Sequence, residues 1–305
     1  MFFSRLLKNT NLNFVKTHKI AFFISVVLIF FSFFSIITRG FNFGIGFSGG
    51  VLIEAEIKEK IAILEVRKVL SQEDFRSFNI QEVGENGVMI RVSPQDQVKD
   101  QTKTATKIKE SLDKNFPNQF EYRKTDFVGP QVGAELIKKG VMALVISFTI
   151  MMFYIWVRFD WQFGVGAVLA LVHDVILTMG LFSFIQLEFD LTSIAAILTI
   201  VGYSVNDSVV IYDRIREYLR KYKKKEIEEI LNLSINSTLS RTILTAGSTI
   251  VALLALVFLG GEVLRSFSIA VLFGVIIGTY SSIYISAPVL LYMKITRDGK
   301  KSSKK

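Results

Sequence analysis

Six long apolar runs follow one another along the chain, separated by short polar segments and by one long polar insertion. A run of about 18 or more residues with few charges is long enough to cross a bilayer as a helix. The pattern therefore predicts an α-helical membrane protein with six transmembrane helices, the last of which is tilted or extends past the membrane. These helices are expected at residues 20–38, 140–157, 163–184, 191–212, 242–259 and 267–293.

The insertion at residues 40–139 has shorter periods, typical of a folded soluble domain. Alternation of apolar and polar residues indicates strands, and apolar residues three and four apart indicate helices. Ser93 is a candidate N-cap with Pro94 at the first helical position, and residues 84–87 read as a hairpin turn. The order β-α-β-β-α-β predicts a ferredoxin-like α+β domain, with elements at residues 51–57, 61–70, 78–83, 88–92, 94 to about 117, and 120–128.

The positive charges predict the orientation in the membrane. The chain has a formal net charge of +9 and is 50% hydrophobic. Its Lys and Arg residues cluster in the tail 1–19, at Arg158, in the loop 214–225 and in the tail 294–305. Counted span by span these four segments lie on one side, which the positive-inside rule makes the cytoplasm. Arg39, Lys138, Lys139 and Arg265 are mild exceptions.

This distribution indicates a multi-pass membrane protein with both termini cytoplasmic and the insertion outside. It also argues against nucleic acid as a partner, because the charges flank membrane spans. The first apolar run is too long for a cleavable signal peptide, and no small-residue cleavage site follows it. Five membrane helices then occupy residues 140–293 after the insertion.

The composition offers no catalytic centre or cofactor site. The chain has no cysteine, so disulfides and thiolate metal sites are not expected. Glycine-rich joints flank the insertion, but no Gly-Lys-Ser or Gly-Lys-Thr triplet of a phosphate-binding loop follows them. We expect no enzyme activity, no metal and no cofactor.

The two joints are candidate hinges. Gly49 and Gly50 lie in the first, and Gly129 and Pro130 in the second. Short segments at the ends of elements absorb dihedral change when domains move. Alternatively, the glycines serve only as turn residues that adopt positive φ without steric cost.

Asp207 lies within the fourth apolar run, and a carboxyl there costs roughly 2.5–3.5 kcal/mol on insertion scales. Tyr203 and Ser204 precede it by four and three residues and share its helix face. An acid in this setting can titrate near neutral pH, which predicts a proton-coupling role. Alternatively, a permanently protonated Asp207 would bind a neighbouring helix. Asn206 is read as a supporting hydrogen-bonding residue.

Arg241 opens the fifth run and is a candidate partner for Asp207. Thr242, Thr245 and a hydroxyl at Ser248 or Thr249 follow at helical spacing, giving one polar face. A switchable ion pair between Arg241 and Asp207 is geometrically possible. Alternatively, Arg241 is an interface anchor that extends toward the headgroups.

His173 and Asp174 lie near the middle of the third run. Two ionisable groups at that depth are costly, which favours a role in a proton path or a pair with a partner. A satisfied packing histidine is the alternative.

The residues together resemble the SecF subunits of the SecD/SecF family, part of the resistance-nodulation-division (RND) superfamily. The resemblance rests on residues 202–217, the Ala-Leu-Val-His-Asp-Val segment at 170–175, Arg241-Thr242, Phe47-Ser48-Gly49-Gly50, and Val128-Gly129-Pro130. The first joint departs from the usual family form, which has Asp at the place of Gly46 and Thr at that of Ser48.

This resemblance implies a subunit of the Sec preprotein translocase accessory complex that pairs with SecD in the bacterial cytoplasmic (inner) membrane. Asp207 and Arg241 match the acid and arginine thought to couple proton entry to movement of the outer domains. Those domains would hold unfolded preprotein while SecYEG conducts it and SecA acts on the cytoplasmic side. The proton-motive force would thus assist a late stage of export.

Two other functions fit the same pattern. One is half of a proton-driven RND-type exporter of lipid or small solutes. The other is a non-conducting scaffold of the translocon in which the buried acid is structural.

Overall fold

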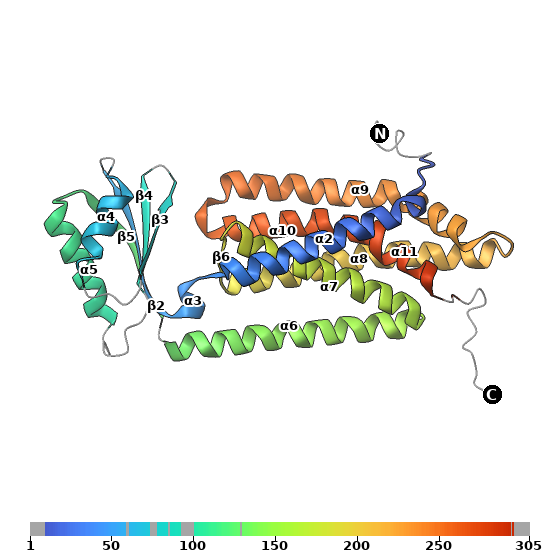
Figure 1. Cartoon of the computed structure of the whole chain (residues 1–305), viewed down its shortest axis with the longest axis horizontal. Helices are drawn as coiled ribbons and strands as arrows, with labels where there is room; N and C mark the ends of the chain where they lie inside the picture. The colour runs from blue at the N-terminus through green and yellow to red at the C-terminus, as the bar shows by residue number, and fades with distance from the viewer. Residues whose placement is uncertain are drawn as a thin grey trace. The chain divides into compact units, whose positions relative to one another are not determined.

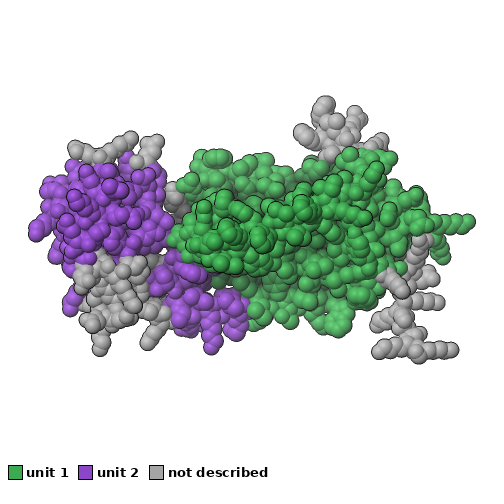
Figure 2. All heavy atoms as spheres, viewed as in Figure 1, with its two compact units in different colours: residues 1–42, 144–187, 192–305 green, residues 43–143, 188–191 purple. Residues whose placement is uncertain are grey.

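The computed structural model describes residues 10–58, 61–73, 78–84, 86–92, 101–128, 130–293 and 295. The chain divides into two compact units, coloured separately in Figure 2. The membrane unit comprises residues 1–42, 144–187 and 192–305, and the sheet unit comprises residues 43–143 and 188–191. We describe each unit by itself.

The sheet unit contains a four-stranded sheet whose strands are ordered β3-β4-β2-β5, with every neighbouring pair antiparallel. Along the chain the order is strand, helix, strand, strand, helix, strand, as the hydrophobic pattern predicts. The elements are β2 (Gly50–Ile57), α4 (Ile63–Leu70), β3 (Phe78–Val83), β4 (Gly87–Val92), α5 (Gln101–Asn115) and β5 (Phe120–Val128). Order and pairing together define a ferredoxin-like domain. The predicted cap at Ser93 and Pro94 lies outside the described residues.

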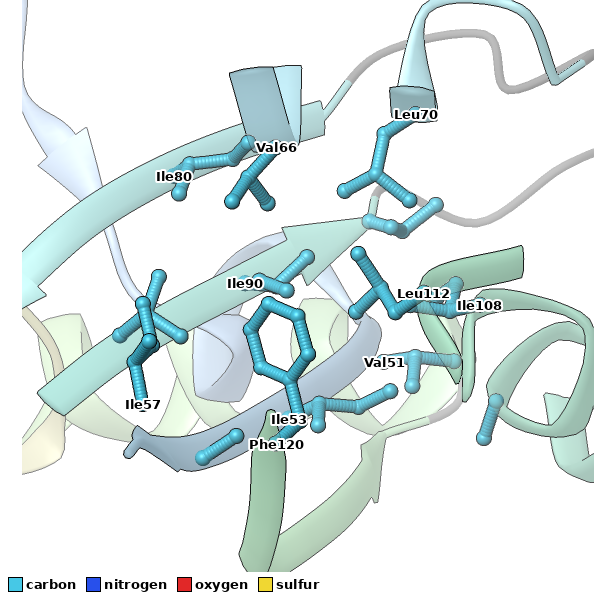
Figure 3. Close-up of a cluster of buried hydrophobic side chains, with 14 residues drawn as sticks. Val51, Ile53, Ile57, Val66, Leu70, Ile80, Ile90, Ile108, Leu112 and Phe120 are labelled. Atoms are coloured by element: carbon cyan, nitrogen blue, oxygen red, sulfur yellow. The ribbon is translucent and has the colours of Figure 1, made fainter. Parts of the chain in front are cut away.

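One apolar cluster forms the core of this domain (Figure 3). Alternate residues of β2, among them Ile53, face the cluster because side chains of a strand point to opposite faces in turn. Ile90 pairs with Ile53 across the β2–β4 ladder. Val66 from α4 and Ile108 from α5 complete the contact from the helical layer, and all four side chains are fully buried. The helices thus cover one face of the sheet.

Six helices of the structure are long and apolar enough to cross a membrane, which confirms the predicted number. They are α2 (Phe14–Arg39), α6 (Pro130–Arg158), α7 (Trp161–Phe184), α8 (Leu191–Lys221), α9 (Ile227–Leu259), and the stretch that begins with α10 (Gly261–Ser281). Within the membrane unit α2 packs against α7, α7 against α10, and α10 against α9 (Figure 1).

Several helices run well past the predicted apolar runs. The fourth continues to Lys221 and the fifth begins at Ile227, so the predicted basic loop shortens to residues 222–226. Charged residues at these ends remain helical because they form pairs one turn apart, such as Arg214 with Glu217 at 2.7 Å. Hydropathy marks where a helix is apolar, not where its hydrogen bonds end.

The last span is not one continuous α-helix. After α10 the backbone enters a π-helical segment, η1 (Ser282–Ser286), in which the Ala287 N–H donates to the Ser282 carbonyl five residues earlier. It then continues as α11 (Ala287–Val289) and a 3-10 turn, η2 (Leu290–Tyr292). Such π segments occur as single wide turns within helices. The span predicted at residues 267–293 is present, at residues 264–292, but its backbone is not α-helical throughout.

The amino-terminal end of α2 is fastened to α9 by two asparagine side chains. The Leu12 N–H donates to Asn236 Oδ1 (3.0 Å), and Asn236 Nδ2 donates back to the Leu12 carbonyl (2.8 Å). The Phe14 N–H donates to Asn232 Oδ1 at 2.9 Å. These bonds satisfy backbone groups at a helix start that no intrahelical partner can satisfy.

Glycines allow close approach between helices of the membrane unit. A Cβ at Gly274 of α10 would lie 2.3 Å from Cγ1 of Ile200 on α8, and one at Gly180 of α7 would lie 2.2 Å from the Ser32 hydroxyl on α2. Small residues at such crossings let backbones pack closely in membranes. The crossing at Gly274 brings the end of α10 onto the polar part of α8.

Candidate functional site

Asp207 is buried within the membrane unit, where its carboxyl accepts hydrogen bonds from two other helical segments. Thr242 of α9 donates to Oδ1 at 2.8 Å, and Ser282 at the start of η1 donates to Oδ2 at 2.7 Å. Only 7% of the Asp207 surface is exposed. The carboxyl therefore joins α8, α9 and the sixth span.

Asp174 of α7 forms a second buried carboxyl centre. Its Oδ2 accepts from Ser204 of α8 at 2.6 Å and from Ser281 of α10 at 2.7 Å. Its Oδ1 lies 2.9 Å from Nδ1 of His173, whereas Nε2 of that ring is buried without a hydrogen-bond partner among the described residues. His173 and Asp174 are thus mutual partners at the centre of the bundle.

The two centres are interleaved on the same segments. Ser204 and Asp207 lie one turn apart on α8, and Ser281 and Ser282 are consecutive on the sixth span. Ser204 and Ser281 donate hydrogen bonds to Asp174, whereas Ser282 donates to Asp207. Sequence reasoning missed both serines of the sixth span, although the Ser-Ser pair within an apolar run is itself an unusual signal.

The polar face expected around Asp207 is only partly present. Thr242 donates to the Asp207 carboxyl, whereas the Ser204 hydroxyl donates to Asp174. Asn206 is exposed, since it lies about 100° around the helix from Asp207. The hydroxyl of Thr245 donates to its own helix, at the carbonyls of Arg241 and Thr242. Tyr203 lies beside Thr245, Thr249 and Thr279.

Arg241 lies on α9 one residue before Thr242, and its charge acts on the Asp207 carboxyl. Its side chain is exposed on the surface of the unit. No ion pair within 4.0 Å joins Arg241 to Asp207 among the residues that the structure describes. The Asp207 carboxyl accepts hydrogen bonds from two hydroxyl groups instead. Arg241 therefore acts on Asp207 through its charge and without a direct contact.

The backbone conformation of the first joint requires glycine at two positions. Gly49 and Gly50 both have positive φ, at 70° and 114°, which non-glycine residues rarely adopt. They follow the short helix α3 (Ile45–Ser48) and lead into β2. Pro130 begins α6, at a position where its missing N–H costs nothing. Gly129 lies outside the described residues.

A buried ion pair holds the turn between α7 and α8 in the sheet unit. Strand β6 (Glu188–Phe189) in this turn pairs with β1 (Asn42–Phe43), and Arg91 of β4 donates to the Glu188 carboxylate. Burial raises the pKa of Glu188 above its ordinary value, and the Arg91 charge opposes that shift. A Cβ at Gly44 would collide with the same carboxylate, which lies 2.5 Å from that position.

The bundle can hold protons at two carboxyls whose neighbours are hydroxyls and one imidazole. Hydroxyl groups both donate and accept, so they can satisfy a carboxylate or a neutral acid. Among the described residues no cluster of three or more His, Cys, Asp and Glu side chains gathers as a metal site would require. Fold and site together define a class: an integral membrane protein of six helices with intramembrane titratable groups and a ferredoxin-like domain.

Comparisons with known proteins give the family. The C-terminal model of the protein export membrane proteins SecD/SecF matches residues 107–296, and the SecD/SecF GG motif matches residues 34–60. The chain belongs to the SecF family of protein translocase subunits. It is 53% identical to the protein translocase subunit SecF of Rickettsia bellii over 94% of this chain and 95% of the relative, and 52% identical to that of Rickettsia felis over 97% of both.

Solved structures of SecDF have the same fold. The crystal structure of SecDF from Thermus thermophilus, described as a translocon-associated membrane protein, matches with a TM-score of 0.85 and 34% identity over 94% of this chain. SecDF in its super-membrane-facing form matches with a TM-score of 0.69 and 32% identity over 93% of this chain. In both cases the chain spans 39% of the longer SecDF chain.

Proposed function

We propose that this protein uses the proton-motive force to assist late-stage export of preproteins across the cytoplasmic membrane. The observation that carries the proposal is the buried carboxyl of Asp207, joined by hydroxyls to α9 and the sixth span and lying near the Arg241 charge. Ionisable groups inside a membrane bundle mark ion and proton pathways. Membership of the SecF family connects that pathway to protein export.

The proposed partners are those that the family indicates. The related SecDF chains are longer, and this chain spans 39% of them. A SecD subunit would supply the remainder. The related SecDF of Thermus thermophilus is a translocon-associated membrane protein, so we place this protein beside SecYEG, with SecA acting from the cytoplasmic side.

The energy supply is adequate for a conformational switch. One charge moving through 100 mV releases about 2.3 kcal/mol, which is comparable with the few kcal/mol that separate two conformations of a protein. Protonation of Asp207 would remove the negative charge that Arg241 experiences, and deprotonation would restore it. His173 and Asp174 would form a second proton site with the Ser204 hydroxyl as a supporting donor, whereas Thr242 would support Asp207.

The sheet unit is the candidate preprotein-binding part. Both termini would lie in the cytoplasm and the ferredoxin-like domain outside, on the side where preprotein emerges. Its outer strands, β3 and β5, are sheet edges, and an extended peptide can add to an edge by backbone hydrogen bonds. Gly49 and Gly50, together with Gly129 and Pro130, would be the hinges.

The test is gradient-driven preprotein release in inverted membrane vesicles that contain the full complex. Asp207→Asn and Arg241→Ala are expected to abolish the part of release that depends on the proton gradient. Asp213→Asn is the matched control, since Asp213 lies on the same helix but is half exposed and pairs with Arg158 at 3.0 Å. If both variants release preprotein as the wild type does, proton coupling is rejected and a scaffold role gains.

A further inference from the structure

The sixth span brings consecutive serines to two different carboxyls. Ser281 donates to Asp174 Oδ2 at 2.7 Å, and Ser282 donates to Asp207 Oδ2 at 2.7 Å. Both serines are completely buried. Consecutive residues of a helix point about 100° apart, which lets one pair of serines reach α7 and α8 at once.

Each of these hydroxyls has a second acceptor within reach on its own helix. Ser281 Oγ lies 3.1 Å from the Gly278 carbonyl, and Ser282 Oγ lies 2.9 Å from the Thr279 carbonyl. A serine hydroxyl carries one hydrogen. It can therefore donate either to the carboxylate or to the backbone, but not fully to both.

The charge of the carboxyl decides between the two acceptors. An ionised carboxylate only accepts, so the serine hydrogen points to it. A neutral carboxyl that donates to the serine oxygen turns the serine hydrogen toward its backbone carbonyl. The hydroxyl of each serine therefore takes one of two orientations, depending on the protonation of its carboxyl. The change is felt at the backbone carbonyls of the last turn of α10, just before the π segment.

The π segment continues the contact beyond the two serines. Ser286, at its end, forms a hydrogen bond with the hydroxyl of Tyr212 on α8. A Cβ at Gly166 of α7 would lie 2.8 Å from the Ser286 carbonyl, so both helices approach this segment. Single π turns within α-helices are frequent at functional sites, and their wide hydrogen bonds can rearrange without unwinding the helix.

We propose that Ser281 and Ser282 are positioning residues through which the π segment, Ser282–Ser286, couples the protonation of Asp174 to that of Asp207. The inference rests on the proposed role of Asp207 as a proton site and goes beyond it. In this proposal the sixth span is the element that responds to the protonation of both Asp174 and Asp207. Neither serine exchanges a proton with solvent.

Other charged or titratable groups lie around the two carboxyls. His173 contacts Asp174, and its ring lies 6.1 Å from that of Tyr280, whose hydroxyl lies 3.1 Å from that of Ser25 on α2. Arg241 acts on Asp207 from α9, and Tyr203 lies one turn away on α8. Ser281 and Ser282 are the connection that the sixth span provides.

The test is an infrared titration of the protonated carboxyl bands in the full-length protein in lipid nanodiscs. Asp174→Asn and Asp207→Asn assign the two bands. We expect Ser282→Ala to raise the Asp207 midpoint by roughly one pH unit or more, because a hydrogen bond to the charged form is lost. Ser281→Ala is expected to do the same to the Asp174 midpoint.

The decisive measurement is made in the Asp207→Asn background, where Ser282 can no longer act through the charge of residue 207. There Ser282→Ala is expected still to raise the Asp174 midpoint, by displacing Ser281. Ser268→Ala is the matched control, since Ser268 is a fully buried α10 serine whose hydroxyl has no partner. An unchanged Asp174 midpoint, or an equal change with Ser268→Ala, would overturn the coupling.

This readout is independent of the export assay. If gradient-driven release survives Asp207→Asn while the serine variants shift both midpoints, the proposed function fails and the coupling stands. If release is lost but the midpoints do not respond to the serines, the coupling fails and the proposed function stands.

Discussion

The hydroxyl of Ser204 donates to the carboxyl of Asp174 on the neighbouring helix, 2.6 Å away. Ser204 lies on α8, one turn before Asp207, so this bond ties the helix of one carboxyl to the other carboxyl. The close crossing of α8 and α10 has the same location, since a Cβ at Gly278 would lie 3.2 Å from the Ser204 Cβ. The two acids are therefore parts of one packed polar layer.

Thr242→Val should weaken proton coupling while preserving packing. Valine has the shape of threonine but lacks the hydroxyl that donates to Asp207 Oδ1. Loss of a hydrogen bond to a charged group costs about 1.5–3 kcal/mol, so we expect gradient-driven preprotein release to fall by roughly tenfold. Thr242→Ser keeps the hydroxyl and should release preprotein nearly as the wild type does. Equal defects in both variants would assign the loss to packing.

Gly274→Ala should destabilise the membrane unit. The added Cβ would lie 2.3 Å from Cγ1 and 2.4 Å from Cδ1 of Ile200, which is buried. Overpacking of this kind costs about 1–3 kcal/mol, measurable as a lower midpoint of thermal unfolding in detergent. Gly202→Ala is the control, because nothing lies within 4 Å of its added Cβ. A Gly274→Ala midpoint equal to that of the control would show that the helices separate easily.

Ile53→Ala should destabilise the ferredoxin-like domain. Ile53 is fully buried at the centre of the cluster in Figure 3, and truncation of such a residue costs about 2–5 kcal/mol. Faster hydrogen exchange across β2 and β4 would report the loss. Leu64→Ala, on the exposed side of α4, should leave the exchange rates close to those of the wild type.

Glu188 should make the stability of the sheet unit depend on pH. Its pKa is raised above 4.5, chiefly by burial, despite the opposing Arg91 charge. The folded state therefore binds this proton more tightly than the unfolded state, so the contribution is fully present below the ordinary pKa and is lost as pH rises through the raised value. Thermal unfolding of the full chain, measured across this range, should show stability falling with rising pH.

Glu188→Gln removes the titrating group and should flatten that part of the pH profile. Glu121→Gln, at an exposed position of β5, is the control and should leave the slope as in the wild type. A wild-type slope that persists in Glu188→Gln would assign the dependence to another group.

The fold of the sheet unit was predictable because the apolar residues of each strand or helix recur at the spacing typical of that element. The strands Phe78–Val83 and Phe120–Val128 begin and end where the apolar alternation does. The membrane helices were predictable in number but not in length, since hydropathy falls at the membrane edge while helical hydrogen bonds continue. The π segment left no mark in hydropathy, because it changes the backbone bonding and not the polarity.

The part of the candidate site that lies on a single helix face was predictable from residue spacing, but the contacts between helices were not. Spacing on α9 placed Thr242 correctly, and depth identified Asp174 and Asp207 as unusual. Residue spacing does not show which neighbouring helix a hydroxyl contacts. Spacing alone therefore groups Ser204 with Asp207, whereas the structure has Ser204 donating to Asp174. Ser281 and Ser282 are neutral and small, and only the packing of the sixth span against α7 and α8 shows their role.

The hydrogen bonds from Asn232 and Asn236 of α9 to the start of α2 bear on the order of assembly. Leu12 and Asn236 are 224 residues apart, so the first membrane helix must wait for the fifth to be synthesised before its own beginning is secured. During that interval α2 can already pack against α7, but the backbone groups at its start do not yet have their partners on α9. The contact that joins the first membrane helix to the fifth therefore forms only after α9 has been synthesised.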